Sequence, residues 1–377
     1  MPGQQHPGQR RRAVALGVLA ALALLAGCSG GSAPRLAIDA PATTASTRAA
    51  APPTTIRPPA GNGPRQPTGN PVALAFGGDV HFEGVIQRRL AGDPATTLGP
   101  ISTVLRQADL AMVNLETAVT DGGTPAGKEF NFRAPPAAFS ALQAAGVDVA
   151  TMANNHGVDY GVAGLRDSLA AAEAAHFPVV GIGRDATQAF AAHQATVRGQ
   201  RIAVIGATQV MDSSLAAAWT AGPGKPGLAS AYQESRLLAA VRAARQVADT
   251  VVVFLHWGKE GATCPIARQR ALAPRLIAAG ADVVVGSHAH RLLGAGFLDG
   301  AYVSYGLGNF VFYARGGLGA QSGVLTLTVR GRAVTGVRWT PAAISGGVPI
   351  PLSGAEAVHA EAAWRSLRGC TGLSAAP

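Results

Sequence analysis

The chain has 377 residues, of which 48% are hydrophobic and 14% are charged, and its formal net charge is +10. This length is sufficient for a hydrophobic core of ordinary size. Arg10–Arg12 contribute +3 of the charge and residues 29–70 a further +3, which leaves a mild +4 on the remainder. Because no basic cluster is interleaved with aromatic residues, we expect no nucleic-acid partner, whereas an anionic substrate or surface polymer is compatible with the charge.

Residues 1–28 have the pattern of an export signal and are not expected to belong to the fold. Three arginines precede the apolar run AVALGVLAALALLA, which is short for a membrane span. The run ends in LAGC at Leu25–Cys28, which resembles the lipobox of bacterial lipoproteins. The resemblance implies that Cys28 is lipidated, so that the protein is an extracytoplasmic lipoprotein anchored in the membrane at the cell surface. An ordinary signal peptide with a chance cysteine is the alternative.

Residues 29–70 are predicted to form a disordered tether. They contain eight prolines together with alanine, threonine and glycine, and they show no apolar periodicity. We expect one domain at residues 71–350, followed by a C-terminal tail at 351–377. After Cys28 the cysteines are Cys264 and Cys370. Outside the cytoplasm this pair could form a disulfide, and two free thiols are equally compatible with the sequence.

From residue 71 onward, short apolar runs alternate with alanine-rich stretches of helical spacing. The expected strands are 72–80, 108–117, 147–156, 201–210, 250–258, 281–290 and 301–310, and the expected helices include 136–145, 162–175, 233–247 and 265–279. This alternation predicts an α/β fold with buried sheets. Residues 323–339 instead alternate between polar and apolar side chains around RGRA, which predicts a late antiparallel hairpin.

Polar residues of the types that bind metals follow these apolar runs at their carboxyl ends. They are Asp79, His81, Glu116, Asn154, Asn155, His156, Asp159, His256, His288 and His290. Because sites in open α/β sheets form beyond the carboxyl ends of strands, we expect these side chains to meet. The last two histidines are one residue apart, and at strand spacing both imidazoles would point to one face.

Carboxylate, imidazole and amide groups together favour hard or borderline divalent ions such as Mn, Fe or Zn. One carboxylate can bridge two such ions, which together bind an anionic oxygen and activate water. No cysteine accompanies these residues, which disfavours a structural zinc site. The sequence has no G-x-S-x-G, and GIGRDA at 181–186 lacks the third glycine of a dinucleotide-binding motif, so a serine hydrolase and a dinucleotide enzyme are also disfavoured.

Six ordered motifs between about residues 72 and 312 resemble the bacterial capsule-synthesis protein family (CapA/PgsA, poly-gamma-glutamate capsule proteins). The motifs are GGDVHFEG, NLETAV, ANNHGVDYG, HWGKE, GSHAH and YGLGNFVF. That family is similar in turn to calcineurin-like metallophosphoesterases, which implies a four-layer α/β/β/α sandwich with a two-metal site. The resemblance implies one ion held by Asp79, His81 and His290, a second held by Asn155, His256 and His288, and Glu116 as the bridge between them.

The resemblance also implies roles for residues around the metals. His156 would be the proton donor or oxyanion partner, with Asp159 orienting it. The segment KEFNFRAPP at 128–136 places Arg133 where it could bind a carboxylate or phosphate. Asn309 follows a glycine turn, where it would contact substrate or cap the turn. The chain departs from these families in three ways. The bridging residue is Glu116 where phosphoesterases usually have aspartate, and Asp159 does not follow His156 directly as their acid does. Ala289 stands between the last two histidines, where the capsule family usually has proline.

The family resemblance implies a surface lipoprotein that acts on, or helps to assemble, an anionic extracellular polymer. Membrane proteins of capsule synthesis are the partners this implies, and a metal-dependent hydrolase is the implied enzyme class. A non-catalytic polymer-binding scaffold lipoprotein and a cell-envelope metallophosphoesterase are the alternatives.

Overall fold

The computed structural model describes residues 65–314 and 316–377. The expected targeting segment, Cys28 and most of the expected tether lie outside the described residues. The first strand, β1 (Pro67–Val80), begins before the expected domain boundary at residue 71, so the last residues assigned to the tether belong to the fold. Among the helices of the described ranges, none has the length and hydropathy required to cross a membrane.

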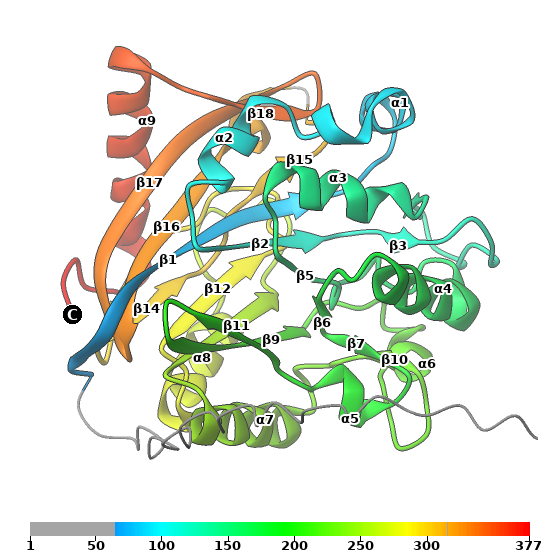
Figure 1. The fold of residues 1–377 in the computed structure, drawn as a ribbon, viewed down its shortest axis with the longest axis horizontal. Helices are drawn as coiled ribbons and strands as arrows, with labels where there is room; N and C mark the ends of the chain where they lie inside the picture. Colours follow the sequence, from blue (N-terminus) through cyan, green and yellow to red (C-terminus); the bar gives the residue numbers. More distant parts are fainter. Residues whose placement is uncertain (1–64, 315) are drawn as a thin grey trace, which may run out of the picture. The chain divides into compact units, whose positions relative to one another are not determined.

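The first sheet is mixed and has eight strands (Figure 1). Along β1, β2, β5 and β6 the strands are parallel, and β15 also runs parallel to β1. On the other side of β1, the strands β16, β17 and β18 are antiparallel, and β16 and β17 form the hairpin expected around RGRA. The bounds are β2 (Leu110–Leu115), β5 (Val149–Thr151), β6 (Val179–Val180), β15 (Asn309–Val311), β16 (Gln321–Gly331), β17 (Ala333–Ser345) and β18 (Val348–Pro351).

The second sheet has six strands in the order β13-β14-β12-β11-β9-β8. Its centre, β14, β12, β11 and β9, is parallel, and an antiparallel strand closes each edge. The bounds are β8 (His193–Val197), β9 (Gln200–Thr208), β11 (Thr250–His256), β12 (Val283–Ser287), β13 (Ala295–Leu298) and β14 (Ala301–Ser304). Two short pairs lie apart from these sheets: β3 (Ala118–Val119) with β4 (Arg133–Ala134), and β7 (Ile182–Gly183) with β10 (Gly227–Leu228).

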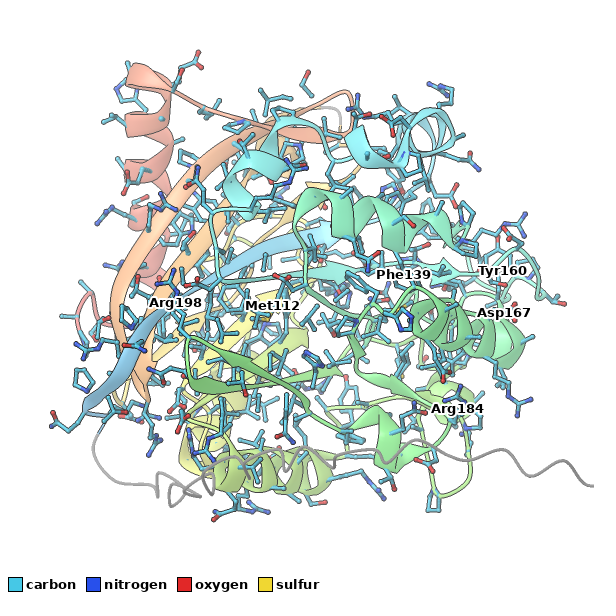
Figure 2. All side chains as sticks on the ribbon, viewed as in Figure 1. Met112, Phe139, Tyr160, Asp167, Arg184 and Arg198 are labelled. Atoms are coloured by element: carbon cyan, nitrogen blue, oxygen red, sulfur yellow. A yellow bond between two sulfur atoms is a disulfide. The ribbon has the colours of Figure 1, made fainter. Side chains whose placement is uncertain are left out.

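The two sheets face each other across one apolar layer, and helices cover their outer faces. Phe76 of β1 and Phe254 of β11 meet edge to face in this inner layer, with ring centroids 6.4 Å apart. Met112 belongs to the same layer, whereas Phe139 lies in the outer layer against the first sheet (Figure 2). Since the central parallel strands of both sheets, such as β2, β11 and β12, are buried on both faces, they are continuous apolar runs rather than alternating ones. The expected four-layer α/β/β/α sandwich is confirmed.

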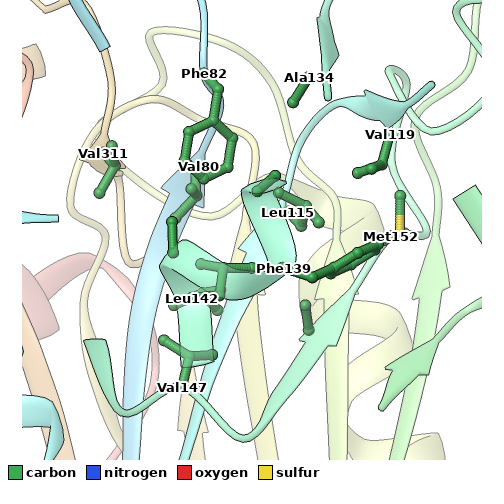
Figure 3. Packing of buried hydrophobic residues seen from close by; sticks show 14 of the residues in the cluster. Val80, Phe82, Leu115, Val119, Ala134, Phe139, Leu142, Val147, Met152 and Val311 are labelled. Carbon is green, nitrogen blue, oxygen red and sulfur yellow. The ribbon is translucent and has the colours of Figure 1, made fainter. Parts of the chain in front are cut away.

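The outer helices bury one apolar stripe each. Phe139 and Leu142 of α3 (Ala137–Ala145) pack on β1, β2 and β5, as Figure 3 shows. On the second sheet, α7 (Glu234–Val247) buries Leu237 and Val241 at the i, i+4 spacing of a helical face. The remaining helices are α1 (Val85–Gly92), α2 (Ser102–Leu105), α4 (Gly161–Ala174), α5 (Ala186–Ala189), α6 (Ala216–Trp219) and α8 (Ala267–Ala279).

The C-terminal segment at residues 351–377 is attached to the sandwich. Helix α9 (Gly354–Ser366) stacks Trp364 on Trp339 of β17, with ring centroids 4.9 Å apart. Ser374 then exchanges two backbone hydrogen bonds with Phe297 of β13. A disulfide joins Cys264 to Cys370. Of the two alternatives left open by the sequence, the structure therefore has the disulfide.

The expected strand at 301–310 is divided between the two sheets. Residues 301–304 form β14 of the second sheet, and Asn309 begins β15 of the first. The crossing chain runs so close to β1 that a Cβ on Gly78 would lie 1.9 Å from the carbonyl oxygen of Gly308. Gly78 is therefore required by this close approach. The crossing brings Asn309 into register with Asp79.

Candidate metal centre

The carboxyl ends of strands from both sheets meet at one edge of the sandwich. From the first sheet, Asp79 lies in β1, Glu116 follows β2, and Asn155 and His156 follow β5; from the second, His256 ends β11, and His288 and His290 follow β12. The parallel direction of these strands places their ends at the same edge. The polar residues that end these strands therefore come from two sheets, and not from one.

Two groups of three ligand atoms form at this edge, and they have Glu116 in common. One group is Glu116, His256 and His288, and the other is Asp79, Glu116 and His290. Within each group the ligand atoms all lie within 4.8 Å of one another. The amide oxygen of Asn155 lies 2.7 Å from Nε2 of His256, which adds a further oxygen beside the first group. This arrangement suits two divalent ions on either side of one carboxylate.

The side chain of Glu116 is fully buried, and neither of its carboxylate oxygens has a hydrogen-bond partner among the described residues. Nδ1 of His288 is likewise buried and without a partner there. Burial raises the pKa of Glu116 well above its usual range, and the neighbouring Asp79 raises it further. Because an unpaired buried carboxylate is costly, the residues present fit a bound cation at this position.

The imidazoles of the centre differ in their protonation. Burial lowers the pKa of His256 well below its usual range and that of His288 to about 3, so both rings are neutral near pH 7 and able to bind a cation. Burial also acts to lower the pKa of His290, but Glu116 and Asp79 outweigh it and raise the pKa to about 10. Binding of a cation at His290 would therefore displace a proton.

The His288–His290 pair converges for a reason other than strand alternation. Strand β12 ends at Ser287, so both histidines lie in the following loop, where their φ angles are +96° and +53°. Left-handed backbone is unfavourable for residues with a side chain and costs on the order of 1–3 kcal/mol per residue. The two ring centroids lie 5.9 Å apart. The strand-spacing argument was therefore wrong, and a strained loop brings the two rings to the site.

The model of the bacterial capsule synthesis protein family, PGA_cap, matches residues 73–314. The chain belongs to this capsule-synthesis family. It is similar to the PGA biosynthesis protein CapA of Bacillus subtilis (strain 168), with 31% identity over 64% of this chain and 63% of that protein. It is also similar to the capsule biosynthesis protein CapA of Bacillus anthracis, with 32% identity over 56% of this chain and 52% of that protein. These matches span less than two thirds of either relative.

Among solved structures, the chain is similar to a novel phosphatase of Mycoplasma pneumoniae. The likeness has a TM-score of 0.44 and 15% identity, and it covers 78% of this chain and 98% of the other. It is also similar to the sulfate thiohydrolase SoxB of Thermus thermophilus, with a TM-score of 0.45 and 16% identity over 81% of this chain and 61% of the other. Likenesses at this level carry no information about activity.

In this capsule-synthesis family member, His156 stands beside the two ligand groups and is held by Asp159. Nδ1 of His156 lies 2.6 Å from Oδ2 of Asp159, and Nε2 lies 4.0 Å from Oε1 of Glu116. An ionised carboxylate can only accept, so Nδ1 carries the proton and Nε2 faces the centre. Burial lowers the pKa of His156, and the hydrogen bond to Asp159 opposes that effect.

His81 is not part of the ligand groups formed by the described residues. The ring of Phe132 lies between His81 and His156, with centroids 4.9 and 4.0 Å away. The two ring nitrogens of His81 face the backbone N–H groups of Glu83 and Tyr313, at 3.0 and 3.3 Å. The structure therefore differs from the expected ligand set here, because an aromatic ring and two backbone groups surround the imidazole.

The two expected substrate-binding residues also have other contacts. The exposed guanidinium of Arg133 lies over the ring of Tyr160, 5.0 Å from its centroid, and not against a ligand residue. Asn309 is buried, and its Oδ1 accepts from Nδ1 of His290 at 2.8 Å, while its Nδ2 donates to the carbonyl of Gly319 at 2.9 Å. Both the oxygen and the nitrogen of the Asn309 amide are thus engaged, so Asn309 orients His290 instead of contacting substrate.

Three further residues belong to the site and were not predicted. Asn114 lies between the sheets, with its Nδ2 2.8 Å from Oδ1 of Asp79 and 3.1 Å from Nδ1 of His256. Lys128 reaches in from the loop before β4 and lies 2.6 Å from Oδ1 of Asp159. Glu260 forms a third ligand group with His288 and His290. Asn114 precedes Glu116 in the motif NLE, Lys128 begins KEFNFRAPP, and Glu260 ends HWGKE, so all three were inside segments already noted.

Proposed function

We propose that this protein is a metal-dependent hydrolase of capsule-polymer synthesis that holds two divalent ions around Glu116. The observation that carries the proposal is the sharing of one buried, unpaired carboxylate by two ligand groups. Membership of the capsule synthesis family supports an anionic extracellular polymer, such as poly-gamma-glutamate, as the substrate. The mild positive charge of the domain is compatible with such a polymer.

The ligands divide between the ions as follows. Asp79 and His290 would hold one ion, His256, His288 and Asn155 would hold the other, and Glu116 would bridge them. Imidazole, carboxylate and amide ligands without cysteine suit Mn, Fe or Zn. When bound, the ions polarise the substrate oxygen and activate water for attack.

His156 is the residue placed to move the proton. Its Nε2 faces the centre because Nδ1 donates to Asp159, so Nε2 is the atom that takes up a proton and passes it to the leaving group. Lys128 pairs with Asp159 and also donates to the backbone carbonyl of Asn155. These two contacts hold Asp159 and the loop that carries Asn155 and His156 in place. In the hydrolysis, water supplies a hydroxyl group to one fragment and a proton to the other.

We also propose the cellular location. Lipidation at Cys28 would anchor the protein in the membrane, and residues 29–64 would hold the domain away from its outer surface. Membrane proteins of capsule synthesis are the proposed partners. These proposals rest on the LAGC motif and on the family, since both segments lie outside the described residues.

The test measures metal content and cleavage on the same preparation of the full chain. The chain is loaded with Mn²⁺, Fe²⁺ or Zn²⁺ and given poly-gamma-glutamate or bis(p-nitrophenyl) phosphate, with His156→Gln as the matched variant that retains the proposed ligands. We expect two ions per chain, and cleavage of the polymer that falls by about 10²–10⁴-fold in the variant. Polymer binding without cleavage would support the scaffold alternative, and cleavage of the diester alone the phosphoesterase. A chain that binds none of these ions would overturn the proposal.

A further inference from the structure

A third group of ligand atoms lies on the solvent side of the metal centre. The carboxylate of Glu260 and the imidazoles of His288 and His290 have ligand atoms that all lie within 4.8 Å of one another. Glu260 is exposed. Glu116, which the first two groups share, is fully buried, and so are its neighbours Asp79 and His256. A third carboxylate therefore approaches the centre from the side where substrate must enter.

The backbone around Glu260 is held by the fold on this side of the centre. The next residue, Gly261, donates its backbone N–H to the carbonyl of Ala289, which lies between the two histidines, at 2.9 Å. Earlier in the loop, Trp257 donates its backbone N–H to the carbonyl of Ser287 at 3.2 Å. The disulfide at Cys264 holds the far end of the same loop. Two backbone hydrogen bonds thus join the loop after β11, which carries Glu260, to the end of β12 and the loop that carries the two histidines.

Two features of the histidines in this group favour a bound cation beside them. Nδ1 of His288 is buried and has no hydrogen-bond partner among the described residues. His288 and His290 both have positive φ angles, so the loop that directs them toward the centre is in a strained backbone conformation.

We propose that Glu260 is a third carboxylate ligand of the metal centre. It would act together with His288 and His290, from the solvent side. With two divalent ions and the carboxylates of Asp79, Glu116 and Glu260, the centre keeps one net positive charge. Without Glu260 it would keep two. Lys128 and Asp159 neutralise each other and do not alter this balance.

The charge balance indicates the substrate class, and this step rests on the proposed function. A centre with one net positive charge matches a monoanion, such as the carboxylate of a polymer unit. It disfavours a dianionic phosphate monoester, because the exposed Glu260 carboxylate would repel the second charge at close range. Glu260 therefore selects for a carboxylate polymer over phosphate.

The experiment titrates the metal-free full chain with Mn²⁺ and follows free Mn²⁺ by electron paramagnetic resonance. It compares the wild type with Glu260→Gln and with Glu356→Gln, a control that makes the same chemical change at an exposed position in α9. We expect Glu260→Gln to weaken one Mn²⁺ by about tenfold or more, as for loss of a metal-supporting contact, and the control to match the wild type. Glu260→Asp, which keeps the carboxylate, should recover part of the affinity.

A second measurement adds inorganic phosphate to the Mn²⁺-loaded proteins. Phosphate should bind more tightly to Glu260→Gln than to the wild type, by about tenfold. Equal Mn²⁺ affinities in the wild type and Glu260→Gln would overturn the proposal and leave the two-metal centre standing. Weaker Mn²⁺ binding with unchanged phosphate binding would overturn the substrate-class step alone. A wild type that binds no Mn²⁺, Fe²⁺ or Zn²⁺ would instead contradict the proposed function.

Discussion

Oε1 of Glu116 lies 3.4 Å from Nε2 of His256, although Glu116 follows a strand of the first sheet and His256 ends a strand of the second. Both side chains are fully buried. A cation between them would link the two sheets at this edge, and it would satisfy a carboxylate that has no hydrogen bond among the described residues. Replacement of either residue therefore tests whether the centre holds metal.

Glu116→Gln should remove both ions. The substituted amide keeps the size of the side chain but loses the charge that both ligand groups share. We expect the metal content, measured by atomic emission on the dialysed full chain, to fall from two ions to nearly none. Retention of one tightly bound ion would show that Glu116 is not a bridge.

His256→Gln should remove mainly one ion. His256 belongs to a single ligand group, and the other group, Asp79, Glu116 and His290, keeps all its members. We expect about one ion per chain after dialysis, together with a Tm between those of the loaded and metal-free wild type. Loss of both ions in this variant would mean that the two positions are filled only together.

Removal of metal should destabilise the folded chain. An ion that binds the native state alone adds about 2.7 kcal/mol when its concentration is a hundredfold above its Kd. We expect a chelator to lower the Tm of the wild type measured by circular dichroism. Glu116→Gln should show little change with the same chelator, and a chelator effect of equal size in that variant would contradict the assignment.

Loss of the Cys264–Cys370 disulfide should lower the free energy of unfolding. The bond joins residues 106 positions apart, and closing a loop of that size in the unfolded chain is worth about 4 kcal/mol or less. The variant in which both cysteines are serine should unfold at lower urea concentration, and its slope m should rise because the unfolded chain exposes more surface. Addition of a reductant to the wild type should reproduce the shift, whereas the serine variant should not respond.

Cys28→Ala should release the protein from membranes. If Cys28 carries a lipid, its loss removes the anchor and leaves the domain and tether unchanged. After fractionation of expressing bacteria, we expect the wild type with the membranes and the variant in the soluble extracytoplasmic fraction. Unchanged membrane retention of the variant would argue against the lipoprotein.

The sequence by itself determined the fold class and singled out most of the residues that we propose as ligands. Strands buried on both faces must be continuous apolar runs, and helices that cover them must show a 3.6-residue stripe, so the α/β alternation was visible in the chain. Asp79, Glu116 and His256 could be identified because unfavourable polar residues stand at the ends of such runs. These are local properties of the chain, so they can be recognised in the sequence alone.

The tertiary structure decided which of these residues lie together in one group of possible ligands. The division of 301–310 between two sheets places Asn309 beside His290, and a loop with positive φ angles directs His288 and His290 into the site. The ring of Phe132 lies between His81 and His156, while Lys128 and Glu260 reach the centre from loops. Each outcome depends on distances between segments far apart in the chain. These distances follow from the packing of the two sheets against each other, so residue type and spacing do not determine them.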